Sequence, residues 1–214
     1  MKNTIDALSI VSDELKNPTV SFLLEPLSNH HYGTYIHSIH VAFIAVQVGI
    51  LSDLSDEDLG IIATGSVLHD IGKLYIPSNI LDKKSPLTEE EFNHIKEHPE
   101  SGYNILRANN FSEDISQIAL LHHLKLNKTG YPTNSNNAEA RNLIEKPISN
   151  IVQIIQVADM FEAIVTTRAY KKKYDIKKAI ELLEKDVNLG VLEYQYVAKV
   201  SELLQNNQLL LQTI

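Results

Sequence analysis

The sequence predicts an all-α protein. Apolar residues recur at helical spacing along most of its 214 residues, and no segment shows the sustained alternation of a half-buried strand. Seven prolines and eight glycines are too few for a long disordered linker. A hydrophobic fraction of 43% is ample for one core, so we expect a single large domain with a short N-terminal appendage.

Helices in the N-terminal third are predicted from apolar stripes and one capping signal. The first stripe contains Ile5, Leu8, Val11 and Leu15, and a second apolar segment follows Pro18. Residues 34–51 are nearly all apolar, which predicts a helix buried on most sides. Ser55 precedes three acids and is the expected N-cap of a helix that runs to about Gly72.

The remainder of the chain is also expected to be helical, with two irregular stretches. The first lies between Pro77 and Pro86, and Thr88 with Glu91 then forms a capping box that begins another helix. Pro99 is expected to break or restart it, with helices following over 100–109 and 112–124. Residues 127–147 have the composition of a long loop, which is usually functional inside a compact domain. Helices over 148–167, 174–187 and 193–204 complete the chain.

Composition restricts the classes of function. There is no cysteine, so any metal must be held by imidazole and carboxylate, which suits iron, manganese or zinc. The net charge of −8 argues against a general nucleic-acid surface. We identify no run of the about 18 apolar residues that a membrane-spanning helix needs, and no signal peptide, so we expect a cytoplasmic protein without a membrane partner.

The adjacent pair His69 and Asp70 is the most informative feature for function. Together they offer a nitrogen and two carboxylate oxygens to one small volume, and a carboxylate can bridge two cations. Other polar residues interrupt apolar helices or lie at helix junctions: His37, His98, His122, His123 and Asp159. A single histidine of this kind is usually a satisfied core residue. Because unpaired buried polar groups are costly, several on separate helices indicate convergence on one metal site.

The motifs also follow a specific order along the chain. They are His37-Ser38, His69-Asp70-Ile71-Gly72-Lys73, Ile76-Pro77, His98-Pro99, His122-His123, Gly130-Tyr131-Pro132, Val157 to Phe161 and Arg168 to Lys171. In this order they resemble the HD-GYP subgroup of the HD-domain metal-dependent phosphohydrolases, over about residues 34 to 200. The resemblance implies an HD-domain-like helical bundle with an inserted long substrate loop. It divides the chain into an appendage over 1–33 and a catalytic domain over 34–214.

The resemblance also implies a site and a reaction. Two divalent ions, iron or manganese, would be held by His37, His69, Asp70 and Asp159 on one side and by His98, His122 and His123 on the other, with Asp70 bridging. A bridging hydroxide would attack phosphorus in cyclic di-GMP and release pGpG, with further cleavage to GMP left open. The remaining implied residues are Lys73 and Glu162 in catalysis and Tyr131, Arg168 and Lys171 in substrate binding.

Several of these residues have simpler structural interpretations. Lys73 could instead be the cation at a helix C-terminus, and Glu162 a surface acid. Arg168 and Lys171 belong to a run of cations that would also suit a solvated surface. His40, one helical turn from His37, is a weaker candidate neighbour of the site.

The chain departs from the pattern of the subgroup at four positions. Gly33 stands where trinuclear members have glutamate, which favours two metals over three. Leu124 replaces a glutamate after the paired histidines, and Asn127-Lys128 replaces an Asp-Gly pair. These changes leave the metal ligands intact but alter the substrate loop, so their effect on rate is open.

Cyclic di-GMP hydrolysis is therefore the leading hypothesis, with three alternatives. One is a catalytically weak cyclic-dinucleotide-binding module that signals through a protein partner or as a homodimer. Another is an HD phosphohydrolase acting on a different nucleotide, and the last is a helical scaffold without metal. Since only residues 1–33 precede the matched region, we expect no attached sensor domain. The sequence leaves open the metal, the preferred cyclic dinucleotide, the oligomeric state and the regulatory input.

Overall fold

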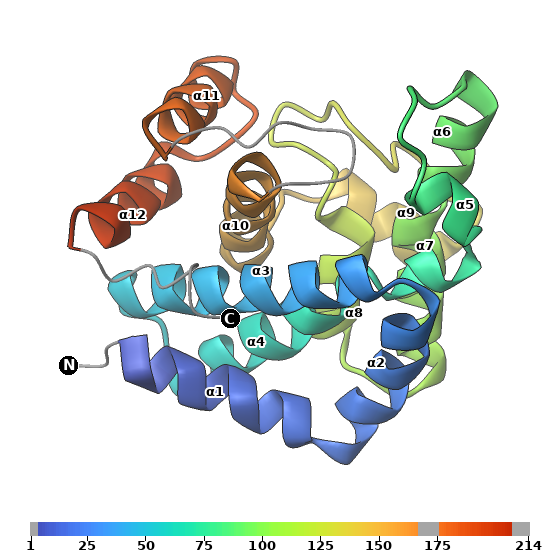
Figure 1. The fold of residues 1–214 in the computed structure, drawn as a ribbon, viewed down its shortest axis with the longest axis horizontal. Coiled ribbons are helices and arrows are strands. Elements are labelled where there is room, and N and C mark those ends of the chain that lie inside the picture. Colours follow the sequence, from blue (N-terminus) through green and yellow to red (C-terminus); the bar gives the residue numbers. More distant parts are fainter. Residues whose placement is uncertain (1–3, 167–175, 207–214) are drawn as a thin grey trace.

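The computed structural model describes residues 4–166 and 176–206, and its regular elements in these ranges are all helical. This confirms the predicted all-α class. The elements are α1 (Thr4–Lys16), α2 (Pro18–His30), α3 (Tyr32–Leu51), α4 (Asp56–Leu68), the 3-10 helix η1 (Ile71–Tyr75), α5 (Ser78–Leu81), α6 (Glu89–Ile95), α7 (His98–Ala108), α8 (Glu113–Leu121), α9 (Ala138–Glu145), α10 (Asn150–Val165), α11 (Ile176–Asn188) and α12 (Tyr194–Gln205). In Figure 1, α3 crosses the centre of the molecule, with α1 and α2 below it and α10 above.

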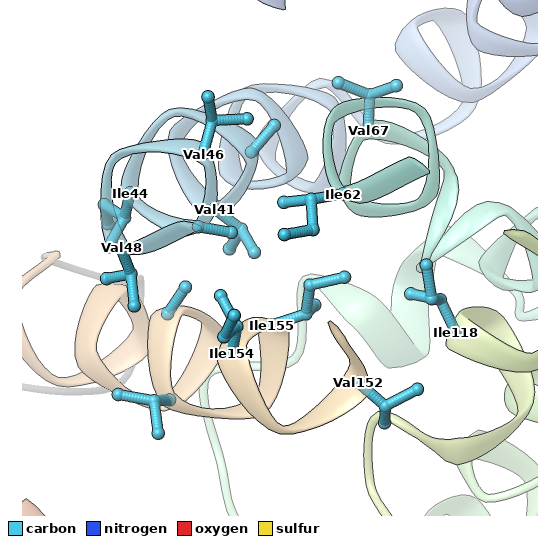
Figure 2. Close-up of a cluster of buried hydrophobic side chains, with 14 of the residues drawn as sticks. Val41, Ile44, Val46, Val48, Ile62, Val67, Ile118, Val152, Ile154 and Ile155 are labelled. Carbon is cyan, nitrogen blue, oxygen red and sulfur yellow. The ribbon is translucent and has the colours of Figure 1, made fainter. Parts of the chain in front are cut away.

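Helix α3 forms the centre of the core, as its composition predicted. It packs against α4 and α10, and nearly every side chain between His37 and Gly49 is buried. Val41, Ile62 and Ile155 come from these three helices and point into the same interior space (Figure 2). Full burial of one such side chain contributes roughly 1.5–3 kcal/mol. By length and composition, α3 would also pass as a membrane span, and so would α9 and α10 taken together as one bent pair. The burial of α3 is that of a core helix.

Side-chain caps set several of the helix starts. The Ser55 hydroxyl accepts from the backbone N–H of Asp58, and Thr88 with Glu91 forms the complete capping box. Both caps agree with the sequence prediction, and each contributes on the order of 1 kcal/mol. Pro99 occupies the first turn of α7, where its missing N–H removes no helical hydrogen bond. The helix expected over 100–109 therefore begins at His98.

Two element predictions were wrong in part. The expected loop over 127–147 contains α9, whose buried face is formed by Ala140, Leu143 and Ile144. These apolar residues have helical spacing, but the surrounding Asn and Ser content indicated a loop. In α1 the buried residues are Ala7 and Val11, whereas Ile5 is 75% exposed, so the apolar face is rotated from the predicted stripe.

The predicted appendage, residues 1–33, contributes α1 and α2. Both helices pack against α3 and α4, so the described part of this segment covers one side of the core. The division at residue 34 stays a prediction.

Candidate metal centre

Asp70 lies at the centre of the polar cluster, directly after α4, and is almost fully buried. Four imidazoles surround its carboxylate. Oδ2 lies 3.8 Å from Nε2 of His37 and 3.5 Å from Nε2 of His69. Oδ1 lies 3.3 Å from Nε2 of His98 and 3.7 Å from Nε2 of His122. Each carboxylate oxygen therefore faces its own pair of histidines, which is the arrangement that a bridging ligand requires.

All seven predicted ligands are brought together. Their potential ligand atoms fall into two groups in which each atom lies within 4.8 Å of the others: one group is His37, His69 and Asp70, and the other is Asp70, His98, His122 and His123. Asp159 joins the first group through Oδ1, which lies 3.1 Å from Nε2 of His37. The residues come from α3, α4, α7, α8 and α10 or from their ends. Their roles as ligands stay predictions.

Three of the histidines are oriented by the ends of helices. His69, His98 and His122 each donate their Nδ1–H to the carbonyl three residues earlier, at 2.7, 2.6 and 2.8 Å. These carbonyls belong to the last turns of α4, α6 and α8, where backbone oxygens have no helical partner. The bond fixes the tautomer, so Nε2 carries the lone pair and is directed at Asp70.

His37 lies mid-helix and is oriented by a side chain instead. Its Nδ1–H donates to the buried carboxylate of Glu162, and the other oxygen of that carboxylate lies 3.3 Å from Nδ1 of His40. Burial would raise the pKa of Glu162, but its hydrogen bonds to His37 and His40 lower it well below the usual range. Glu162 is therefore not a surface acid. It contacts His37 rather than the cavity, and His40 is part of this site through it.

The donor set fits divalent metal ions. Among the described residues, Nε2 of His69 and Oδ1 of Asp70 are buried without a hydrogen-bond partner. Such atoms are costly in a protein interior, and a cation beside them would satisfy both. Imidazole nitrogen and carboxylate oxygen are the ligands that iron, manganese and zinc accept.

The pKa shifts differ between His37 and the other ligand histidines whose shifts are resolved. Burial lowers the pKa of His69, His122 and His123, so these imidazoles stay neutral, as ligation requires. Burial would also lower the pKa of His37, but the hydrogen bonds and charges of Asp159 and Glu162 outweigh it and raise the pKa to about 9. In the metal-free protein His37 therefore carries a proton that His69, His122 and His123 do not.

Lys73 lies in the site. Its ammonium donates to Oδ2 of Asp70 at 2.6 Å and lines the cavity beside the cluster. Burial would raise the pKa of Asp70, but the charge of Lys73 above all holds it well below its usual range. Lys73 is thus half-buried and paired within the site rather than solvated, and its role as a phosphate contact stays a prediction.

The cluster opens into a cavity of about 950 Å³, whose walls include Lys73, Phe92, Lys125, Tyr131 and Met160. The Tyr131 ring lies 4.7 Å from the His123 ring and 6.3 Å from Phe92, centroid to centroid. Tyr131 is therefore a wall of the cavity, consistent with its predicted substrate role. The predicted contacts Arg168 and Lys171 lie outside the described residues.

Two glycines allow the backbone to approach the ligand histidines. A Cβ at Gly72 would overlap the carbonyl oxygen of His98, so η1 packs directly on α7. For this reason α4 ends at Leu68 and a tighter turn carries the motif, whereas the sequence predicted a helix to Gly72. Gly130 has φ +91°, and a Cβ there would overlap the carbonyl oxygen of His123.

The altered substrate loop keeps an ordered turn. The side-chain Oδ1 of Asn127 accepts from the N–H and the hydroxyl of Thr129 at 3.1 and 2.6 Å, which is a turn that asparagine favours. Lys128 adopts φ +61°, a left-handed conformation in which non-glycine residues are uncommon. Leu124 is buried in the core. The departures therefore change side chains around the site without removing the loop.

A helical bundle that encloses a buried His/Asp cluster of this kind defines the HD-domain class. The sequence model of the HD domain matches residues 23–189, which is more than half of the chain and begins before the expected boundary at residue 34. The chain belongs to the HD-domain family, and its ordered motifs are of the HD-GYP type, which confirms the resemblance found in the sequence.

Curated relatives carry the same region. The chain is 32% identical over 173 residues to the cyclic di-GMP phosphodiesterase response regulator RpfG of Xanthomonas campestris, covering 80% of this chain and 44% of that protein. It is 32% identical over 155 residues to a 3'3'-cGAMP-specific phosphodiesterase of Vibrio cholerae, covering 72% of this chain and 32% of the relative. The chain thus spans less than half the length of these relatives.

Among solved structures, the HD domain of the phosphodiesterase PgpH from L. monocytogenes in complex with cyclic-di-AMP is similar, with a TM-score of 0.66 and 26% identity. The match covers 90% of this chain and 98% of that domain.

Proposed function

We propose that the protein is a metal-dependent phosphodiesterase that hydrolyses cyclic di-GMP to linear pGpG. The observation that carries this proposal is Asp70, whose two oxygens face separate histidine pairs beside an open cavity. Relatives named as cyclic di-GMP phosphodiesterases support the choice of substrate.

Two divalent ions, iron or manganese, would be held by the seven predicted ligands. When bound, such a pair supplies Lewis-acid stabilisation of phosphoryl oxygens and lowers the pKa of water to near neutrality. The protein's own contribution is to hold the Nε2 atoms at fixed angles, because the Nδ1–H groups of His69, His98 and His122 are already committed to backbone carbonyls.

Lys73 and Tyr131 would act on the substrate itself. Asp70 holds the Lys73 ammonium at the edge of the cluster, where it stabilises negative charge that develops on the phosphoryl oxygens. Burial raises the pKa of Tyr131, so its hydroxyl remains protonated and its ring offers a neutral face to a base. Glu162 would hold His37 in place and take no proton from the substrate, because its carboxylate is engaged by two imidazoles.

The test is product formation by the reconstituted protein. Protein loaded anaerobically with iron, and separately with manganese, is expected to convert cyclic di-GMP to a linear product resolved by chromatography, with Asp70→Asn as the inactive control. If neither form gave linear product, the proposal would fail. Tight binding without turnover would identify a binding module instead.

A different cyclic dinucleotide is the second candidate substrate. It is favoured by the likeness to a 3'3'-cGAMP-specific phosphodiesterase. Values of kcat/KM measured side by side for cyclic di-GMP, 3'3'-cGAMP and cyclic di-AMP would rank the three substrates.

A further inference from the structure

Lys125 lines the same cavity as the metal ligands, two residues after His123. Its half-buried ammonium lies 3.3 Å from Sδ of Met160. A thioether is only a weak acceptor, and within residues 4–166 and 176–206 no carboxylate lies at ion-pair distance from this lysine. Because a cation withdrawn from water is costly without a counter-ion, this placement indicates that its partner is missing.

The other lysines of the cavity differ from Lys125. Lys73 is paired with Asp70, and Lys83 contacts both oxygens of Glu91 at 2.7 and 2.5 Å. Lys84 is exposed and solvated. Of the described cavity lysines, Lys125 alone is withdrawn from water without a carboxylate beside it.

The acids that act on Lys125 do so from a distance. Asp159 and Asp186 influence it electrostatically, but neither is at contact distance. Asp159 is itself an expected metal ligand, so its charge would be committed to the metal in the loaded protein. Among the acids of the described residues no other counter-charge is available, so an anion that enters the cavity would supply it.

We propose that Lys125 binds the second phosphodiester of a cyclic dinucleotide while the first is held at the His/Asp cluster and Lys73. This inference rests on the proposed function and deepens it. A cyclic dinucleotide carries two phosphodiester groups on one ring, so two cationic positions in one cavity would distinguish it from a substrate with a single phosphate. Lys125 would thus determine specificity and affinity, whereas the cluster and Lys73 act on the bond that is cleaved.

The test is Lys125→Met, which keeps the length of the side chain and removes its charge. The expected result is a rise in KM for cyclic di-GMP of about 10- to 100-fold, the usual effect of a lost charge-assisted hydrogen bond. Cleavage of bis(p-nitrophenyl) phosphate, which has one phosphodiester, is expected to change by less than about threefold by the same reasoning. Lys125→Arg should retain most of the affinity for cyclic di-GMP.

Lys128→Met is the matched control from the same loop. Lys128 donates to the carbonyls of Ile144 and Lys146 at the end of α9, so its loss should lower the Tm with little change in KM. Lys125→Met is expected to leave the Tm of the unliganded protein unchanged or raised, because it removes a buried charge without a partner. If Lys125 were merely structural, Lys125→Met would instead lower the Tm and reduce the cleavage of both substrates equally.

The outcomes separate the two proposals. If the wild-type protein cleaves cyclic di-GMP and Lys125→Met leaves its KM unchanged, the role of Lys125 is overturned and the proposed function stands. If the wild-type protein cleaves bis(p-nitrophenyl) phosphate but none of the cyclic dinucleotides, the proposed function fails and the role of Lys125 fails with it.

Discussion

His37 donates its Nδ1–H to the carboxylate of Glu162, which is almost fully buried behind the metal centre. On the opposite side of the same ring, Nε2 lies 3.1 Å from Oδ1 of Asp159. His37 is therefore the link between an interior carboxylate and the ligand cluster. Glu162 acts on the centre through this ring, as carboxylates beside metal-binding histidines commonly do.

Glu162→Gln should weaken metal binding at the first group. The substitution keeps the shape of the side chain but removes the charge that holds His37, and the loss of such a partner typically costs about 10- to 100-fold in metal affinity. Competition against a chelator would measure the effect, with the exposed Glu145→Gln as control. An NMR titration of the metal-free protein should also show a lower pKa for His37. Unchanged values in both measurements would contradict this role.

Metal binding to the first group should depend on pH. The pKa of His37 is raised to about 9, so this imidazole is protonated at pH 7 in the metal-free protein and must lose its proton to bind a cation. Below that pKa the apparent affinity should fall about tenfold per pH unit, since proton and metal compete for Nε2. The neutral His122 and His123 impose no such competition.

Calorimetry at pH 7 in buffers of different ionisation enthalpy would count the protons released. About one proton per ion, released by His37, is expected at the first group. None is expected from His122 or His123. A heat of binding that is independent of the buffer would show that His37 is already neutral.

Most of the ligand set was predictable because its members either are polar exceptions in an apolar context or, like His98, lie at a helix junction. Asp159, for example, is the only acid between Asn150 and Phe161, and burial without a partner would be costly. The same reasoning did not reveal the function of Glu162 or His40. Helices α3 and α10 are apolar on nearly all sides, so their sequences do not indicate which faces meet.

The orientation of the ligands was not predictable for a different reason. His69 is oriented by the carbonyl of Ser66, which is available because α4 ends at Leu68. The sequence pattern extended that helix to Gly72, and there the carbonyl would have had a helical partner. The early end follows from the contact of Gly72 with α7, which is a tertiary contact that local sequence does not specify.

Gly130→Ala should destabilise the protein. Gly130 has φ +91° and leaves no space between its Cα and the His123 carbonyl, so a methyl group would strain the backbone and displace the loop that carries Tyr131. The expected loss is about 1–3 kcal/mol in the free energy of unfolding. Gly60→Ala is the control, because Gly60 lies inside α4 with open space around it and should gain about 0.4–1 kcal/mol. Denaturant unfolding of both variants would measure this difference, and equal effects would refute the strain at Gly130.

Lys73→Met tests whether Lys73 acts in catalysis rather than in metal retention. Lys73 contacts Asp70 but offers no lone pair while protonated, so the variant should keep its metal content by elemental analysis. Loss of a preorganised cation at the developing phosphoryl charge should lower kcat by about 100- to 1000-fold. Lys83→Met removes a lysine of the same cavity whose charge is already committed to Glu91, so its kcat should stay near that of the wild type. If Lys73→Met lost its metal together with its activity, metal binding by Asp70 would depend on Lys73. Lys73 would then be a residue that holds Asp70 in position.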